Sequence, residues 1–333
     1  MRYLDIDTTP KISKIGLGTW QFGAKEWGYG EDYAQQRASG IVRRAVELGV
    51  TLFDTAEVYG HGRSERILGE ALRQLPQAQV FLATKVLPVV PLAPYVQQRA
   101  VASADRLGVR RIDLYQVHHP NPLASEEPIM RGMGALQRIG LVGEVGVSNY
   151  SLERWQEAEK ALGGRVLSNQ VRYNLVDRGP EEELLPFAAT AGRVVIAYSP
   201  LAQGLLSGRY DRANRPANRV RAGNRVRPGN PLFLPENLDR AGELISALRE
   251  VAEAHQATPA QIALAWVIRH PAVTAIPGAS SVEQLEGNAA AAEIELPDDE
   301  VAALSAAADR FQPVTGRDAR PAQVRDRLRR LRA

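Results

Sequence analysis

The chain has 333 residues and a formal net charge of +3, and 44% of its residues are hydrophobic while 24% are charged. This composition is that of a globular protein and excludes disordered and collagen-like chains. The absence of cysteine excludes a disulfide scaffold, a thiolate metal centre and a cysteine nucleophile. No run of 18 apolar residues occurs and the first residues lack the apolar core of a signal peptide, so we expect a cytoplasmic protein without a membrane partner.

Positive charge is concentrated in two segments of the chain. Residues 209–227 hold seven arginines and one acidic residue, and residues 317–332 hold seven arginines and two acidic residues. The remainder of the chain is therefore acidic, and the basic balance does not indicate a nucleic-acid partner. Only five basic residues are lysines, and one of them, Lys85, ends a predicted strand.

Eight short apolar runs recur along the chain, and most are continuous, which is typical of strands buried on both faces of a parallel sheet. We predict these strands at residues 15–19, 50–55, 80–86, 112–118, 142–149, 166–171, 194–200 and 273–278. Amphipathic patterns between them predict helices at residues 35–49, 64–75, 93–108, 126–140, 151–164, 180–192, 258–270 and 281–292. Ser64 and Ser151 are expected to cap the helices that begin with them.

Eight alternations of strand and helix predict a single (β/α)8 TIM barrel domain that spans residues 1–333. A doubly wound sheet is the alternative, but no GxGxxG lies between the first strand and its helix, and eight units are many for an open sheet. Three pieces lie outside the repeat. We predict an N-terminal β-hairpin, an excursion at 201–254 with a long loop and an extra helix at 236–254, and a C-terminal helix at 298–310 followed by a basic tail at 312–333.

Polar residues end several predicted strands, at the face of the barrel where such enzymes carry their active sites. Asp54, Lys85 and His118 end the second, third and fourth strands, and Tyr59 follows Asp54 by five residues. Asp54 and Lys85 can form a buried ion pair, and a cation beside Tyr59 is expected to lower the pKa of its phenol. Together with a hydrogen bond from His118 to a substrate oxygen, this set could protonate an oxyanion that develops on a carbonyl carbon.

Other interpretations of these residues stay open at this point. Taken singly, Asp54 and Lys85 are more often a structural ion pair, and Tyr59 a structural loop residue. A lyase or aldolase could use Lys85 to form a Schiff base. We expect no metal site, and no Ser–His pair supplies a nucleophile, so reduction by a bound hydride donor suits the four residues best.

Seven motifs resemble those of the aldo-keto reductases, and they are FDTAEVYG, LATKV, DLYQVHHP, GVSNY, NQVRYN, YSPLAQGLLSGRYD and IPGASSVEQLEGN. They occur in the family's order between about residue 12 and residue 292. The resemblance implies a catalytic tetrad, Asp54, Tyr59, Lys85 and His118. In it Tyr59 is the general acid, Lys85 and Asp54 tune it, and His118 orients the carbonyl. The hydride would come from a nicotinamide cofactor bound in an extended form, without a Rossmann domain.

The resemblance also implies a set of contacts along that cofactor. The nicotinamide end would be held by Ser148, Asn149, Gln170 and the ring of Tyr198. In a branch that includes potassium-channel β subunits, the diphosphate would be lined by Ser199, Leu201, Gln203, Gly204, Ser207 and Arg209, with Arg219 near the ribose phosphate. The adenosine end would contact Ser280, Gln284 and Asn288. The remaining predicted cofactor contacts are Gly18, Thr19, Trp20, Asp54, Pro200 and Gly278.

Cofactor preference and substrate are less well defined by these motifs. Ser280 and Ser281 stand where many family members carry Lys or Arg against the 2′-phosphate of NADP, and Gly287 replaces a common acidic residue. We expect NADPH, because Ser280 and Arg219 can hold the phosphate, with NADH as the alternative. The partner would be a small-molecule carbonyl substrate, and the aromatic residues Trp20, Trp27 and Tyr29 favour a fairly apolar one. A cofactor-loaded regulatory subunit with weak catalysis is the competing function, and either a monomer or a homo-oligomer fits the sequence.

Overall fold

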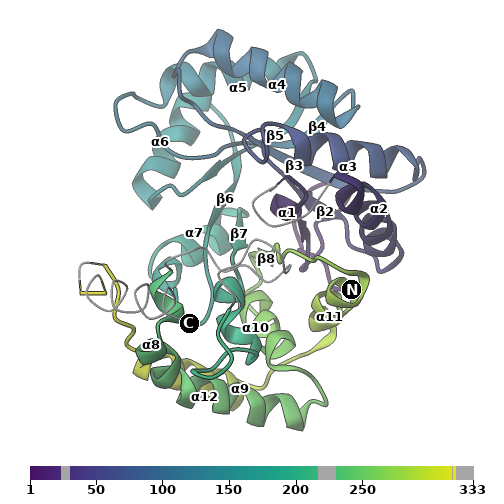
Figure 1. The fold of residues 1–333 in the computed structure, drawn as a ribbon. Coiled ribbons are helices and arrows are strands. Elements are labelled where there is room, and N and C mark those ends of the chain that lie inside the picture. The colour runs from purple at the N-terminus through teal and green to yellow at the C-terminus, as the bar shows by residue number, and fades with distance from the viewer. Residues whose placement is uncertain (24–30, 217–229, 317, 320–333) are drawn as a thin grey trace, which may run out of the picture.

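A computed structural model of the protein describes residues 1–23, 31–216, 230–316 and 318–319, and of residues 31–36 it describes the backbone alone (Figure 1). Eight strands form one sheet in which spatial order follows chain order and every neighbouring pair is parallel. The strands are β1 (Leu17–Gly18), β2 (Leu52–Asp54), β3 (Phe81–Val86), β4 (Ile112–Val117), β5 (Val142–Ser148), β6 (Val166–Arg172), β7 (Val194–Tyr198) and β8 (Val273–Ala275). Each predicted strand is confirmed, with ends that differ by a few residues.

The helices lie around the sheet and connect successive strands (Figure 1). The α-helices of the described part are α1 (Trp20–Gly23), α2 (Glu31–Glu47), α3 (Arg63–Arg73), α4 (Ala93–Leu107), α5 (Glu127–Arg138), α6 (Leu152–Leu162), α7 (Leu184–Ala191), α8 (Pro235–Arg240), α9 (Gly242–Ala254), α10 (Pro259–Ile268), α11 (Val282–Ala290) and α12 (Asp298–Arg310). Short 3-10 helices are η2 (Gly179–Glu181), η3 (Ala202–Ser207), η4 (Pro231–Phe233) and η5 (Ala291–Glu293). The extra helix predicted at 236–254 is in fact the pair α8 and α9. No helix in the described ranges is long and apolar enough to cross a membrane.

The two ends of the sheet meet, which makes the fold a barrel and excludes the doubly wound alternative. Isolated parallel bridges join Ile15 to Ala275 and Gly18 to Gly278. The Gln21 amide closes the same seam, because its Nε2 donates hydrogen bonds to the carbonyls of Gly18 (3.0 Å) and Ala279 (2.8 Å). The strand order and this closure are those of a (β/α)8 barrel.

Residues of alternating position on the strands divide the inside of the barrel into an apolar and a polar layer. Leu52, Phe81 and Leu114 are buried in one cluster with Leu4 and Ile12 of the N-terminal hairpin. This hairpin is present as an antiparallel bridge between residues 3 and 13. Side chains two residues apart on a strand share a face. The residues two positions after Leu52 and Leu114 are Asp54 and Gln116, so these strands bring polar side chains to the other end of the barrel. Apolar packing therefore closes the N-terminal end beneath the polar layer.

The two predicted serine caps have different outcomes. Ser151 caps α6, since its side chain accepts a hydrogen bond from the backbone N–H of Arg154. The cap predicted at Ser64 is wrong, because α3 begins one residue earlier, with Gly62 at the N-cap position and no side-chain cap. Gly62 has a φ of 82°, a conformation that glycine adopts at little cost. The hydroxyl of Ser64 is instead free to point into the protein interior.

Candidate active site

A buried ion pair occupies the polar layer of the barrel, where β2 and β3 end. The Nζ of Lys85 lies 2.6 Å from Oδ1 of Asp54, and the two residues are 0% and 2% exposed. The same ammonium donates to the carbonyl of Thr55 at 2.8 Å and to the phenolic oxygen of Tyr59 at 3.4 Å. The predicted ion pair is confirmed. This ion pair holds the ammonium group of Lys85 within hydrogen-bond distance of the Tyr59 phenol.

The second carboxylate oxygen of Asp54 is held by two amides. Gln170 donates to Oδ2 at 2.8 Å, and Gln116 donates to the same atom at 3.4 Å. Gln116 in turn accepts from the hydroxyl of Ser168 at 3.4 Å. Gln116, which is fully buried, is not among the predicted site residues, although a glutamine two residues before His118 in an apolar run is a signal for a polar contact inside a barrel.

Tyr59 keeps its proton more tightly than expected. Burial raises the pKa of Tyr59 above its usual value, and the positive charge of Lys85 opposes this without cancelling it. The expectation of a lowered pKa is therefore wrong, because removal of the phenol from water outweighs the nearby cation. For Lys85, burial acts to lower the pKa, but the charges of Asp54 and Tyr59 leave it raised, so the residue stays cationic. The pair consists of a neutral phenol and a charged amine.

His118 lies beside the phenol and has a nitrogen without a protein partner. Its ring meets that of Tyr59 edge to face, with centroids 5.7 Å apart. Within the described part of the chain, its buried Nδ1 makes no hydrogen bond. Burial, with smaller effects of Lys85 and His119, lowers the pKa of His118 to about 3. A neutral imidazole beside the phenol can form a hydrogen bond to a bound ligand.

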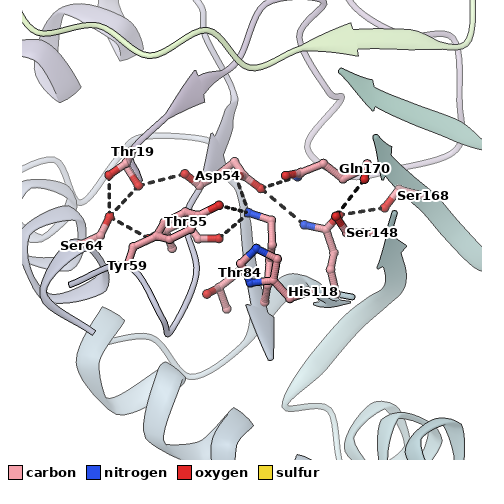
Figure 2. A network of polar contacts seen from close by, with 12 residues as sticks. Thr19, Asp54, Thr55, Tyr59, Ser64, Thr84, His118, Ser148, Ser168 and Gln170 are labelled. Carbon is pink, nitrogen blue, oxygen red and sulfur yellow. Dashed lines mark hydrogen bonds and ion pairs between the residues drawn. The ribbon is translucent and has the colours of Figure 1, made fainter. Parts of the chain in front are cut away.

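A network of three hydroxyl groups, those of Thr19, Thr55 and Ser64, holds the backbone carbonyl of Asp54 (Figure 2). Thr19 donates its hydroxyl to the carbonyl of Asp54 at 2.9 Å, and Ser64 donates to the carbonyl of Thr19 at 2.7 Å. The hydroxyl of Thr55 donates to that of Ser64 at 2.9 Å. This network joins the end of β1 to the end of β2. It explains why Ser64 is not available as a helix cap.

The side chains expected at the nicotinamide end lie next to one another. Ser148 donates its hydroxyl to the carbonyl of Gln170 at 2.8 Å, and Asn149 donates to the carbonyl of His118 at 3.2 Å. The phenol of Tyr198 donates to Oδ1 of Asn149 at 2.9 Å. Asn149 has a φ of 63°, the left-handed conformation that asparagine tolerates better than most residues. These contacts preset a patch of amide and hydroxyl groups beside the ion pair.

The turn after β7, expected to line a diphosphate, has an unusual backbone. Ser199, Ala202, Gln203 and Gly204 all have positive φ angles. Such turns can direct successive backbone N–H groups to one side, which favours anions. Pro200 is buried in this turn and Leu201 is half-buried; Ser207 donates its hydroxyl to the carbonyl of Gly204, and the side chain of Arg209 is exposed. Arg219, Trp27 and Tyr29 lie outside the described residues.

The residues expected at the adenosine end surround the start of α11. Ser280 donates both its backbone N–H (2.9 Å) and its hydroxyl (2.7 Å) to Oε1 of Gln284. Asn288 donates to the carbonyl of Gly278 at 3.3 Å. A Cβ on Gly18 would lie 2.8 Å from the carbonyl oxygen of Ile276, so this glycine is required by the seam of the barrel.

Trp20 is 38% exposed at the start of α1, so a good part of its indole faces solvent. In the ranges that the structure describes, no group of three or more His, Asp or Glu side chains could hold a metal ion. The site therefore combines a cation, a neutral phenol and a neutral imidazole with amide and hydroxyl donors.

Comparison with known proteins identifies the chain's relatives. The model of the aldo/keto reductase family matches residues 14–309. An uncharacterised oxidoreductase of Mycobacterium tuberculosis is 55% identical over 95% of this chain and 96% of its own length, and a methylglyoxal reductase of Escherichia coli is 36% identical over 89% and 91%. The crystal structure of an aldo/keto reductase from Klebsiella pneumoniae in complex with NADP and acetate superimposes with a TM-score of 0.72, at 30% identity over 94% of this chain and 96% of that one. The chain therefore belongs to the aldo/keto reductase family.

Proposed function

We propose that the protein uses NADPH to reduce an aldehyde or ketone to an alcohol, with Tyr59 as the proton donor. The observation that carries this proposal is the contact of Lys85 Nζ with both Asp54 Oδ1 (2.6 Å) and the Tyr59 oxygen (3.4 Å) in a buried layer. A charged amine at this place stabilises a phenolate as the proton leaves, and burial strengthens that interaction.

The reaction adds a hydride to the carbonyl carbon and a proton to the carbonyl oxygen. The nicotinamide, when bound, supplies the hydride. The phenol of Tyr59 gives the proton, and its raised pKa means that it starts the reaction protonated. The neutral imidazole of His118, beside the phenol, orients the carbonyl oxygen, and the fixed charge of Lys85 compensates the negative charge left on Tyr59.

The donor set of the site fits such a cofactor. Ser148, Asn149 and Gln170 offer hydroxyl and amide groups to a carboxamide, and Tyr198 offers a ring face. The positive-φ turn after β7 and the start of α11 suit phosphate groups. The NADP complex of the Klebsiella relative supports NADPH. NADH is the alternative because Ser280 and Ser281 bring no positive charge, and tighter binding of NADH than of NADPH in a fluorescence titration would select it.

Variants of two tyrosines test the assignment of the proton donor. We expect Tyr59→Phe to lower kcat for 4-nitrobenzaldehyde by about 10²–10⁴-fold, since that is the usual contribution of a positioned acid. Tyr173→Phe is the control, because the phenol of this buried tyrosine donates to Glu181, away from Lys85. NADPH affinity, measured by cofactor fluorescence, should be unchanged in both. Equal rates for Tyr59→Phe and the wild type would contradict the proposal.

The same assay separates the competing functions. Tight NADPH binding without turnover by the wild type would favour the regulatory subunit, and borohydride trapping of substrate on Lys85 would favour the lyase or aldolase. The single domain over residues 1–333, the cytoplasmic location and the choice between monomer and homo-oligomer stay predictions of the sequence. Size-exclusion chromatography with light scattering tests the last of these.

A further inference from the structure

The loop between β2 and α3 contains a buried carboxylate that the proposed reaction does not use. Glu57 is 4% exposed. Its Oε1 accepts the backbone N–H of Leu87 at 2.9 Å, and its Oε2 accepts Nε of Arg99, on α4, at 2.6 Å. Its own backbone N–H donates to the carbonyl of Lys85 at 3.2 Å. Glu57 therefore ties its loop to the end of β3 and to α4 at once.

This loop carries Tyr59, two residues after Glu57. The backbone of Tyr59 has two local hydrogen bonds, in which its N–H donates to the carbonyl of Ala56 and its carbonyl accepts from the N–H of Ser64. On the far side the loop touches α1, because a Cβ on Gly60 would collide with the carbonyl of Gly23. The loop is thus held between α1 on one side and the contacts of Glu57 on the other.

The phenol contact is the one most sensitive to a shift of this loop. Of the three hydrogen bonds from Lys85 Nζ, that to Tyr59 is the longest, at 3.4 Å, while those to Asp54 and Thr55 are 2.6 Å and 2.8 Å. A displacement of the loop by a few tenths of an ångström would break the contact with Tyr59 first. The ion pair with Asp54 would survive it.

We propose that Glu57 is a positioning residue that sets the distance between the Tyr59 phenol and the Lys85 ammonium. The carboxylate acts through two contacts, with the backbone N–H of Leu87 and with the side chain of Arg99, and these hold the loop on which Tyr59 sits. This inference rests on the proposed role of Tyr59 as proton donor. Misplacement of a reacting group by a fraction of an ångström reduces the rate without abolishing binding.

The chain offers a close control for this inference. Glu65, on α3, is 0% exposed and accepts Nε of Arg106, also on α4, at 2.6 Å, the same length as in the Glu57 pair. Its other oxygen accepts the hydroxyl of Thr84 at 2.6 Å. Glu65 thus matches Glu57 in charge, burial and arginine partner, but it lies in a helix beyond the loop.

The experiment compares Glu57→Gln with Glu65→Gln. Both variants should unfold at a lower temperature and bind NADPH with unchanged affinity in a fluorescence titration. Only Glu57→Gln should lower kcat, by about tenfold. Only this variant should also show a larger solvent deuterium isotope effect on kcat, because proton donation becomes slower relative to the other steps. A purely structural role would not change that isotope effect.

Arg99→Lys provides a second test that leaves Glu57 in place. The charge stays, but the geometry of the Nε donor is lost, so kcat should fall by a smaller factor of about three with the same isotope signature. Equal kcat losses in the two glutamine variants, or a loss in Glu57→Gln with an unchanged isotope effect, would overturn the inference. A wild type without carbonyl reductase activity would instead refute the proposed function, so the two failures are distinguishable.

Discussion

Replacing Lys85 by methionine probes the central ion pair through stability alone. Methionine keeps an apolar stem but leaves the carboxylate of Asp54, 2% exposed, with the amides of Gln170 and Gln116 as its remaining side-chain partners among the described residues. Removing one partner of a buried ion pair costs about 3–5 kcal/mol, because the other charge stays buried without compensation. We expect a loss of about 4 kcal/mol in the free energy of unfolding, a large part of the stability of an ordinary domain.

A double-mutant cycle with Asp54→Asn isolates the interaction of the two charges. Asp54→Asn alone leaves Lys85 charged and buried, whereas the double variant removes both charges. The double variant should therefore be less destabilised than the sum of the single variants, by about 2–3 kcal/mol. Urea unfolding of the cofactor-free protein, followed by circular dichroism, measures these differences without a contribution from ligand binding.

An exposed ion pair supplies the control for this cycle. Arg310 lies 2.6 Å from Glu243, a distance equal to that of the buried pair, but their side chains are 55% and 60% exposed. The cycle Arg310→Met with Glu243→Gln should give a coupling below about 1 kcal/mol. If the single effects of Lys85→Met and Asp54→Asn add within about 0.5 kcal/mol, the reasoning about the buried pair is refuted.

Three further outcomes follow from the structure. Burial, and to a smaller extent Lys85 and His119, lowers the pKa of His118 to about 3. The pH profile of kcat/KM for a neutral carbonyl substrate should therefore show no ionisation of His118 between pH 5 and 8. A change of kcat/KM with a midpoint near pH 6.5 that His118→Gln removes would contradict this. Burial lowers the pKa of Lys14 to about 8, so between pH 8 and 10 the unfolded chain binds more protons than the folded one. The free energy of unfolding should therefore rise with pH in this range by up to about 1.4 kcal/mol per pH unit relative to Lys14→Met. Equal pH slopes of the unfolding free energy in the two proteins would refute this. Ser64→Ala leaves buried hydrogen-bond partners unpaired and should lower the free energy of unfolding by about 2 kcal/mol, whereas the cap variant Ser151→Ala should lower it by about 1 kcal/mol. Thermal or urea unfolding that gives the reverse order would contradict the role of the hydroxyl network.

The barrel was predictable because its strands are continuous apolar runs and its helices have a clear period. The ends of the strands were predictable too, since a charged residue such as Asp54 or Lys85 after an apolar run has few places to go other than a paired site. The contact of these two residues follows directly from their positions on neighbouring strands.

The misses concern properties that depend on three-dimensional surroundings. The pKa of Tyr59 depends on how much water the loop excludes, and desolvation exceeds the effect of the cation. Ser64 stands at the start of a helical pattern, which favours a cap. Its hydroxyl instead donates to the carbonyl of Thr19 and accepts from the hydroxyl of Thr55, which lie in other segments of the chain. Gln116 lies inside the motif DLYQVHHP, but its partners Asp54 and Ser168 are 62 and 52 residues away in the chain, so its place in the sequence does not reveal these contacts. The hydrophobic pattern of residues 236–254 is helical throughout, so it does not show that this segment divides into α8 and α9.

The seam of the barrel has a consequence for how the chain reaches its native state. The first strand is completed on its open side by residues about 260 positions later, through the bridges at Ile15 and Gly18 and the amide of Gln21. Contacts between such distant parts of a chain are entropically costly to form and slow. During synthesis, β1 therefore remains an open edge until β8 has emerged. A partly made chain lacks this closure and leaves the edge of β1 open for pairing with other chains.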